Sequence, residues 1–487
     1  MSRYSTPVPQ RSTQTANAIP TGNRMSRALW GIVAVWIGTL LALMAMPADP
    51  VPAGALVQSG LWQAAGLLVL PCWQLFTDWR GVLRAEYLLT AGLIIWLLLD
   101  VIQGSYPLTG LEPSDIENIF LAIAAMASAV WLGTIARPWS LPTSVVRAAT
   151  FPFSPQRAYI FILLLFGLGI FYFWSSSGFN PVVMFEALGE SRWAAPWSRG
   201  SLGGWDSFVE HMRYFGYVVP ALTVVYARYA GWLRGKTIFA IILSIIIIAF
   251  ASQGGGRRIT GVMLGAALIC WILLQPRLRP RVVIGSVLAV ILFGIGLQLM
   301  IENRSHGFQQ MESLQVQSDK LHIDDNFYRL GQITTIFPDE HPYVYTEQVT
   351  FALIRPIPRA LWSGKPEHPG YDFSSMVTDQ QVSLTTSVIG EFFASWGWLG
   401  ILLGGYVYGR LGSMWNRLLE ARIPYAVLLY GMGALALFAG LRSMLDLVLM
   451  SYLVLAWLAI TYLLESRPQW KGLPGRRSVP PRKKPYR

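Results

Sequence analysis

Cysteine and charged side chains are both scarce in this sequence. Only two cysteines occur in 487 residues, and Cys72 and Cys270 both fall inside apolar segments. The chain therefore has neither a disulfide framework nor a cysteine spacing of the metal-binding kind, and redox chemistry is not expected. Charged residues make up 13% of the chain and hydrophobic residues 53%. That balance is typical of a membrane protein.

Further absences exclude several function classes. Gly364-Lys365 is followed by Pro366, and no glycine stands five residues before Gly364, so the chain has no Walker A motif for ATP. No inverted repeat with paired broken helices is present to favour a secondary transporter. One long segment after residue 300 holds a group of histidines and aspartates: His306, His322, Asp324, Asp325, His341 and His368. Their spacing is not that of a metal site, so no metal and no other cofactor is expected.

Apolar residues fall in about twelve blocks, each long enough to approach the length of a membrane-spanning helix. The blocks run over residues 28–46, 61–79, 87–102, 116–135, 158–175, 208–227, 237–251, 259–274, 282–300, 387–408, 425–441 and 447–464. No small-residue cleavage site clearly follows the first block, which is therefore interpreted as a signal anchor. The sequence predicts an all-α polytopic membrane protein.

Positive charge is segregated to alternate loops between these blocks. The predicted inner cations are Arg80, Arg84, Arg137, Arg147, Arg157, Arg228, Arg234, Lys236, Arg277, Arg279, Arg281, Arg410, Arg417 and Arg422. The C-terminal tail adds Arg476, Arg477, Arg482, Lys483, Lys484 and Arg487. Because loops rich in arginine and lysine stay in the cytoplasm, both termini are expected there. The net charge of +12 is thus explained by topology, and nucleic acid is not an expected partner.

The chain is expected to divide into five segments. These are a disordered cytoplasmic tail at 1–27, membrane helices over 28–300, a large outer loop with short helices at 301–385, membrane helices over 386–465 and a basic cytoplasmic tail at 466–487. A second outer loop, 176–207, holds Asn180-Pro181 at a predicted helix start, followed by an apolar stretch typical of an interfacial helix. In the larger loop, Phe327, Leu330, Ile333 and Ile336 recur every three residues and predict an amphipathic helix.

Several cations break the segregation because they lie on the outer side. They are Arg192, Arg199, Arg257, Arg258, Arg304, Lys320, Arg329, Arg355, Arg359, Lys365 and Arg442. Since a planar guanidinium binds phosphate oxygens in pairs, arginines converging at the outer leaflet would suit a pyrophosphate whose lipid tail stays in the bilayer. The alternative is that each one reaches lipid headgroups or pairs with acids of its own loop.

Two local motifs add to this interpretation. Gly254-Gly255-Gly256-Arg257-Arg258 forms a tight outer turn at a helix start and would cradle phosphate, or it is only a flexible reversal. Ser387, Glu391 and Ser395 are spaced by four and place a carboxylate about one turn below the outer surface. Glu391 would act as a general base on an acceptor hydroxyl, or it would hold an arginine.

Arg442 and Asp446, four residues apart, predict an ion pair.

The segment from about His341 to Arg410 resembles the C-terminal signature of the Wzy-type oligosaccharide repeat-unit polymerases. The matching residues run from Ile357-Pro-Arg359-Ala-Leu-Trp362-Ser-Gly-Lys365-Pro366 through Tyr371-Asp372-Phe373-Ser374 and Gly390-Glu391-Phe392-Phe393 to Trp396-Gly397-Trp398-Leu399-Gly400. An Arg-x10-Gly spacing associated with these polymerases is met by Arg192 with Gly203 and by Arg359 with Gly370. The string covers about a seventh of the chain.

The resemblance implies a GT-C-like glycosyltransferase of the bacterial inner membrane with about twelve spans and two long periplasmic loops. It would move a growing glycan from undecaprenyl pyrophosphate onto the next lipid-linked repeat unit, without a metal, in exopolysaccharide or surface-polysaccharide synthesis. The implied partners are the lipid-linked oligosaccharide, membrane lipids, a flippase and a chain-length regulator.

Site residues are expected in three roles. The catalytic candidates are Glu391, Arg359 and Arg355. The pyrophosphate ligands are expected to be Arg192, Arg257, Arg258, Arg355, Arg359, Lys365 and Arg442. Trp362, Tyr371 and Asp372 would contact the glycan. The alternatives are a glycan ligase of the O-antigen ligase type, a polysaccharide exporter or secondary transporter, and a scaffold protein of the membrane.

Overall fold

The computed structural model describes residues 21–465, except for a set of short gaps. The gaps are 192, 199–205, 254–255, 278, 304–319, 322, 356, 358, 360, 367 and 378–383. Helices account for all regular secondary structure in the described part, which contains no strand. The all-helical fold agrees with the sequence prediction.

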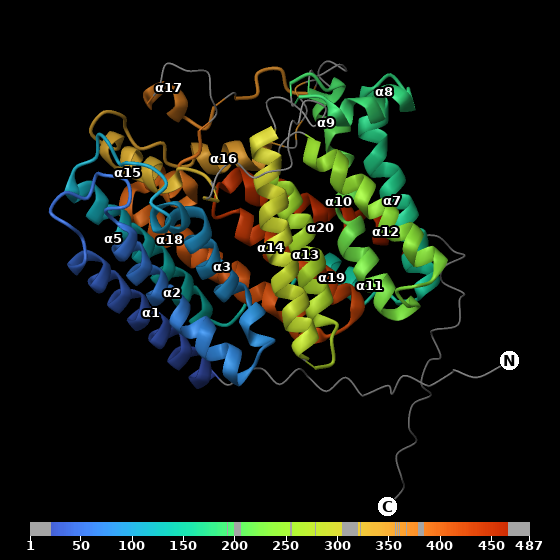
Figure 1. Cartoon of the computed structure of the whole chain (residues 1–487), viewed down its shortest axis with the longest axis horizontal. Coiled ribbons are helices and arrows are strands. Elements are labelled where there is room, and N and C mark those ends of the chain that lie inside the picture. Colours follow the sequence, from blue (N-terminus) through green and yellow to red (C-terminus); the bar gives the residue numbers. More distant parts are fainter. Residues whose placement is uncertain are drawn as a thin grey trace, which may run out of the picture.

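Long helices run back and forth between two ends of the molecule (Figure 1). The first half consists of α1 (Thr21–Met44), α2 (Val57–Thr77), α3 (Ala85–Leu93), the π-helical stretch Ile94–Leu98, α4 (Leu99–Ile102), α5 (Pro113–Ile135), α6 (Thr143–Ala149), α7 (Pro155–Ser176), α8 (Pro181–Glu186), α9 (Asp206–His211), α10 (Arg213–Tyr217) and α11 (Val219–Ala230). The second half consists of α12 (Gly235–Gln253), α13 (Arg257–Leu273), α14 (Pro280–Asn303), α15 (Asn326–Ile336), α16 (Glu347–Ile354), α17 (Phe373–Val377), α18 (Ser387–Ala421), α19 (Pro424–Ala439) and α20 (Met444–Glu465).

Eight helices of the described chain are long and apolar enough to cross a membrane, by length and composition. They include α1, α5, α7, α12, α14, α18 and α20, and the continuous stretch Ala85–Ile102. The shorter helix Pro424–Ala439 is also apolar. Large apolar side chains such as Trp30, Leu288 and Leu292 are exposed on the surface of the helix bundle, as expected where lipid replaces water. These features identify a multi-pass membrane protein.

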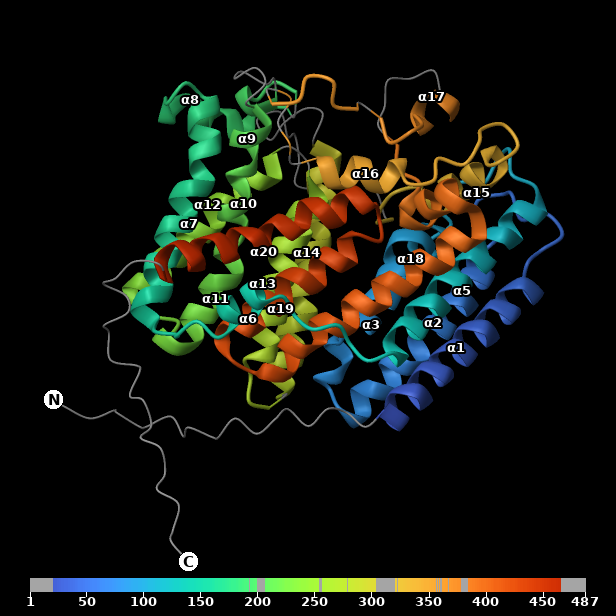
Figure 2. The same cartoon turned by 180° about the vertical axis from the view of Figure 1, so that it is seen from behind.

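Buried side chains form two hydrophobic cores, one in each half of the molecule. One core lies among α7, α10 to α13, α19 and α20, and includes Phe161, Tyr425 and Trp457. The other lies among α1 to α5, α15 and the first half of α18, and includes Phe120 and Phe327. Figure 2 shows the two helix groups side by side, with α18 running from the group of α1, α2 and α5 toward the other and α20 lying across the face of that other group. The outer ends of α18, α19 and α20 therefore lie where the two halves meet.

The loops that carry the predicted inner cations lie together at one end of the molecule. Arg80 donates to the carbonyl of Gln275 at 2.7 Å, and Arg228 donates to the carbonyl of Leu274 at 3.2 Å. Arg84 pairs with Glu420 at 3.8 Å. The short helices α8, α15, α16 and α17 lie at the opposite end (Figure 1), which we call the outer end. The alternating charge of the sequence thus corresponds to the two ends of the fold.

Two predicted local structures are confirmed. The Asn180 side chain accepts a hydrogen bond from the backbone N–H of Val182 at 2.9 Å and caps α8, whose first residue is Pro181. Helix α15 buries Phe327, Leu330 and Ile333 completely, at 0% exposure each. Helix α15 packs against α5 and α18, so the amphipathic face fixes the large outer loop to the membrane helices.

Helix α18 is interrupted within its outer half. Trp396 and Gly397 have non-helical dihedral angles, with Gly397 at φ 60° and ψ −143°. Beyond this kink, Gly400 and Gly404 lie against Phe392, where a Cβ atom would clash with its carbonyl oxygen and its ring. These glycines therefore allow close packing between the two halves of one bent helix. The kink sets the direction of the segment that carries Glu391.

Candidate functional site

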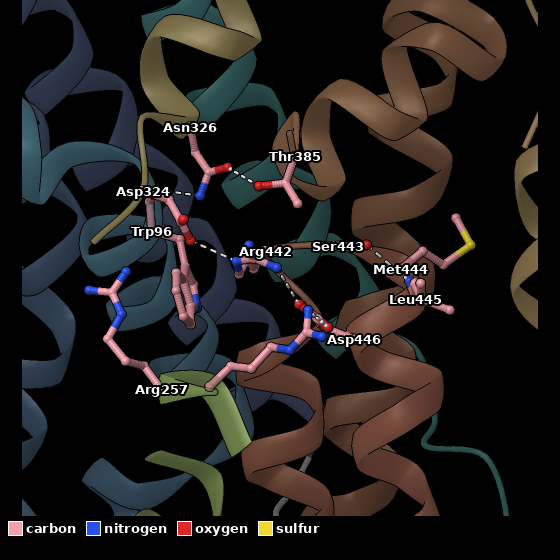
Figure 3. Close-up of polar contacts among 12 residues, drawn as sticks. Trp96, Arg257, Asp324, Asn326, Thr385, Arg442, Ser443, Met444, Leu445 and Asp446 are labelled. Atoms are coloured by element: carbon pink, nitrogen blue, oxygen red, sulfur yellow. Dashed lines mark hydrogen bonds and ion pairs between the residues drawn. The ribbon is translucent and has the colours of Figure 1, made fainter. Parts of the chain in front are cut away.

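A network of charged side chains lies at the outer end, around the start of α20. The Arg442 guanidinium donates from Nε to Asp324 Oδ2 at 2.6 Å and from Nη1 to Asp446 Oδ2 at 3.0 Å. Arg258, from the start of α13, pairs with the other oxygen of Asp446 at 2.6 Å. Figure 3 shows Arg442 between the two carboxylates. The predicted Arg442–Asp446 ion pair is confirmed, and Asp446 also holds Arg258.

Hydrogen bonds extend this network into the other half of the molecule. The backbone N–H groups of Ile323 and Asp324 donate to the Asp100 carboxylate at 3.3 and 3.2 Å. Arg257 donates from Nη2 to the Ile323 carbonyl at 2.6 Å. Asn326 donates to the Trp96 carbonyl at 3.1 Å (Figure 3). Segment 323–326 of the large outer loop is therefore bound to helices of both cores.

Acidic partners neutralise two of the arginines predicted to bind pyrophosphate. Burial disfavours the charged form of Arg442, but the carboxylates of Asp324 and Asp446 outweigh burial and raise its pKa. Asp446 is fully buried at 0% exposure and contacts two cations. Because a buried carboxylate needs such partners, the arrangement stabilises the helix ends that it joins. In this geometry Arg258 joins α13 to α20, and Arg442 joins the start of α20 to Asp324 in the large outer loop.

Glu391 caps the N-terminus of α20. Its Oε1 accepts from the Ser443 hydroxyl at 2.8 Å, and its Oε2 accepts from the Met444 backbone N–H at 2.6 Å. Gln348 of α16 is buried as well, at 5% exposure, and α16 packs against both α18 and α20. A carboxylate at this place satisfies a free N–H group and matches the positive end of the helix dipole. The partner of Glu391 is thus a helix end and not one of the arginines.

A loop at the outer end holds three cations close together. We call residues 355–366 the cation loop, in which Arg355, Arg359 and Lys365 are described. The Lys365 ammonium donates to the carbonyls of Arg355 and Ile357, both at 2.9 Å. Arg359 donates from Nη1 to the Lys365 carbonyl at 2.9 Å. The loop is therefore closed on itself by cationic donors, which hold the three positive groups in one short segment.

Positive charge within the cation loop is only partly compensated. Burial lowers the pKa of Lys365, and the neighbouring charges of Arg355 and Arg359 lower it further. Within the described residues, neither Lys365 nor the Arg355 guanidinium has a carboxylate partner. Repulsion between like charges destabilises the loop, and an anionic ligand would relieve that repulsion.

The three predicted glycan contacts lie in different surroundings. Trp362, in the cation loop, is 41% exposed. Tyr371 is buried against Phe337, with ring centroids 5.5 Å apart. Burial and the nearby Glu391 raise the pKa of Tyr371. The Asp372 carboxylate accepts from the Ser374 N–H at 3.2 Å at the start of α17. Trp362 and Asp372 are exposed and accessible to a ligand, whereas Tyr371 is buried.

Several sequence expectations lie outside the described residues. Arg192, Arg199 and Arg304 fall in gaps of the description, and so do Gly254 and Gly255 of the predicted phosphate turn. The predicted C-terminal tail, 466–487, and most of the predicted N-terminal tail also lie outside it. Arg257 and Arg258, at the end of that turn, open α13 as expected. Among the described residues, no group of three or more histidine, cysteine, aspartate or glutamate side chains is arranged to hold a metal ion.

Sequence reasoning left one outer cluster without a role. His211, Tyr214 and Tyr452 contact one another edge to face, with His211 and Tyr452 centroids 4.7 Å apart. Arg213 lies 5.4 Å from the Tyr214 ring centroid and pairs with Glu210 at 2.5 Å. Tyr452 lies on α20, which packs against α16, the helix that leads into Arg355. The signal was the set of polar residues Glu210, His211 and Arg213 at the start of an apolar block.

The fold and the outer network define a polytopic membrane protein, helical throughout its described part, with a network of charged groups at its outer end. No family model, curated protein or solved structure matches the chain. Function is therefore inferred from the residues and contacts of the protein itself.

Proposed function

We propose that this protein polymerises undecaprenyl-pyrophosphate-linked oligosaccharide repeat units at the periplasmic face of the bacterial inner membrane. It transfers the growing glycan to the next lipid-linked repeat in the synthesis of an exopolysaccharide or another surface polysaccharide. The observation that carries the proposal is the cation loop, in which Arg355, Arg359 and Lys365 are held together at the outer end. The resemblance of residues 357–400 to the Wzy-type polymerases supports the same activity.

The membrane topology is part of this proposal. The shorter or less apolar helices α2, α11, α13 and α19 complete twelve spans of a GT-C-like arrangement. The arginine-rich end then faces the cytoplasm together with both termini, and the outer end faces the periplasm. A diphosphate headgroup would meet the cation loop at that surface while its polyprenyl tail remains in the bilayer.

In the proposed reaction, a hydroxyl oxygen of the acceptor repeat attacks the anomeric carbon of the donor glycan. A new C–O bond forms, the bond from that carbon to the pyrophosphate oxygen breaks, and undecaprenyl pyrophosphate leaves with the electron pair. The hydroxyl proton passes to a base. Arg355 and Arg359 stabilise the negative charge that develops on the leaving group. Lys365 positions them, because its ammonium binds the carbonyls of Arg355 and Ile357.

Glu391 is assigned a positioning role in this mechanism, although the sequence made it the leading base. Both of its oxygens accept hydrogen bonds at the start of α20, and α20 packs against α16. Helix α16 leads directly into Arg355 and the cation loop. Glu391 thus ties the ligand-binding loop to the membrane helices.

Arg355→Ala gives the cleanest test. The Arg355 guanidinium makes no hydrogen bond or ion pair with a described residue, so its removal leaves the loop contacts intact. Losing one such donor costs about 3–4 kcal/mol of transition-state stabilisation, or roughly 10²–10³ in rate. Membranes carrying Arg355→Ala or Arg359→Ala, supplied with lipid-linked repeat units, are expected to accumulate single repeats, as seen on a gel. Arg234→Ala, an exposed cation at the opposite end, is the matched control.

The product pattern separates the alternatives. Full-length polymer from both Arg355→Ala and Arg359→Ala would remove the assignment of these residues. Long free polymer in a strain that lacks the protein would identify a ligase, because chain growth would then occur elsewhere. Substrate uptake into vesicles without a new glycosidic bond would identify a transporter.

A further inference from the structure

Arg410 is a buried cation at the end of the molecule opposite the cation loop. It lies on α18, and its residue is only 8% exposed. The guanidinium carbon lies 4.9 Å from the centroid of the Trp139 ring. The Nε and Nη1 atoms are buried and have no hydrogen-bond acceptor among the described residues. Arg410 also has no ion pair within that part of the chain.

An arginine in this state is costly, because a buried charge requires a partner or an acceptor. The C-terminal part of α5 packs closely on α18 here, because the backbone of Gly133 lies against the backbone of Tyr406 and Arg410. A helix C-terminus supplies only about half a negative charge. The connection from α5 to α7, residues 136–154, carries Trp139, adds Arg137 and Arg147 and contains no aspartate or glutamate. The segment that covers Arg410 therefore offers it no carboxylate.

The position of Trp139 indicates a source of negative charge for Arg410. Trp139 is 42% exposed and stands just after α5, a helix long and apolar enough to span the membrane. Tryptophan is enriched at the depth of lipid headgroups, and basic sites between helices on the cytoplasmic side bind anionic headgroups. A phosphate oxygen at this depth would meet the guanidinium beside the indole ring.

We propose that Arg410 and Trp139 form a binding site for a phosphate oxyanion, supplied by the headgroup of an anionic phospholipid. The guanidinium donates charge-assisted hydrogen bonds to the phosphate, and the indole ring covers one face of the cation. This site is remote from the cation loop and independent of the proposed polymerase activity. It would anchor the inner ends of α5 and α18 to the cytoplasmic leaflet.

The test uses delipidated full-length protein in detergent. Phosphatidylglycerol, phosphatidylcholine or inorganic phosphate is added, and bound molecules are counted by native mass spectrometry alongside the melting temperature. Wild-type protein is expected to retain phosphatidylglycerol and to melt at a higher temperature with it. Arg410→Gln is expected to weaken that binding by about tenfold, because hydrogen bonds to a charged group are lost. Arg417→Gln removes an exposed arginine two turns further along α18 and is expected to bind as wild type does.

Each outcome bears on the site. Equal binding of both lipids, unchanged by Arg410→Gln, would overturn the proposal. Stabilisation by inorganic phosphate alone that is lost in Arg410→Gln keeps the oxyanion site but identifies a soluble ligand as its source. If Arg410→Gln does not fold, Trp139→Leu at the exposed indole serves instead, with several-fold weaker phosphatidylglycerol binding expected. Unchanged lipid binding in Trp139→Leu would then contradict the site.

Discussion

At the scale of single residues, arginines of this protein have different roles that depend on their partners. Arg442 and Arg258 share the buried Asp446. The exposed Arg355 guanidinium, in contrast, makes no hydrogen bond or ion pair with a described residue. A paired arginine stabilises the fold, but an uncompensated one attracts anions. Arg355 is therefore a better candidate for substrate binding than Arg258 or Arg442.

Glu391 allows a prediction that separates a positioning role from a basic one. In Glu391→Gln, the amide oxygen still accepts from the Met444 N–H and the amide nitrogen donates to the Ser443 hydroxyl. Polymer formation in membranes is therefore expected to stay within about tenfold of wild type, whereas a lost general base costs about 10²–10⁴ in rate.

Glu391→Ala is the matched variant for stability. It leaves the buried donors at the start of α20 without an acceptor, which costs about 1–3 kcal/mol. The melting temperature in detergent is expected to fall by several degrees for Glu391→Ala and to change little for Glu391→Gln. Loss of polymer in a well-folded Glu391→Gln protein would restore the base assignment.

At the scale of elements, the kink in α18 places Glu391 relative to the outer loops. The break at Trp396 and Gly397 frees carbonyls of the preceding turn, and two of them accept from the chain before α16. The Val344 N–H donates to the Ala394 carbonyl at 2.9 Å, and the Tyr345 N–H donates to the Ser395 carbonyl at 3.1 Å. The bent helix thus binds the large outer loop directly through its backbone.

Gly397→Ala tests the importance of this kink. At φ 60° and ψ −143° a side chain is strained, and a Cβ atom would lie 2.7 Å from the Tyr343 hydroxyl oxygen. Strain of this kind costs about 1–3 kcal/mol, so a lower melting temperature and reduced polymer formation are expected. Gly294→Ala, on α14 with nothing within 4 Å of the new atom, is the control and is expected to be neutral or slightly stabilising.

At the scale of the whole molecule, two helix groups with separate cores meet along α18 and α20. Charged and polar contacts join them at the outer end, where segment 323–326 reaches Asp100 in one group and Arg442 and Arg257 in the other. Because α16 leads into the cation loop and packs against both α18 and α20, a change in the relative position of the two groups would also change the proposed binding surface.

Cysteine labelling tests the orientation of the molecule in the membrane. With Cys72 and Cys270 replaced by alanine, single cysteines are introduced at Leu361 in the cation loop and at Leu233 in the opposite loop, which are 70% and 92% exposed. A membrane-impermeant maleimide is expected to label position 361 in intact spheroplasts and position 233 only after permeabilisation. The reverse pattern would place the cation loop in the cytoplasm and remove the proposed function.

Much of the architecture could be predicted from local sequence patterns. Apolar runs predicted the helices, Asn180-Pro181 predicted the start of α8, and the three-residue spacing from Phe327 predicted the buried face of α15. These features depend on neighbours in the sequence and on the contrast between water and apolar surroundings. The break of the sixth apolar block into α9, α10 and α11 could not be read from hydropathy, which locates apolar stretches and not the points at which one helix ends and the next begins.

The sequence by itself determined the helical membrane fold, the end at which each group of cations lies and the concentration of positive charge in residues 355–365. Only the tertiary structure decided which of those charges are neutralised. Arg442 meets Asp324 across 118 residues of chain, and Glu391 meets Met444 across 53. Hydropathy and charge placement are local properties of the chain, whereas an ion pair or a helix cap depends on groups that only folding brings within hydrogen-bond distance.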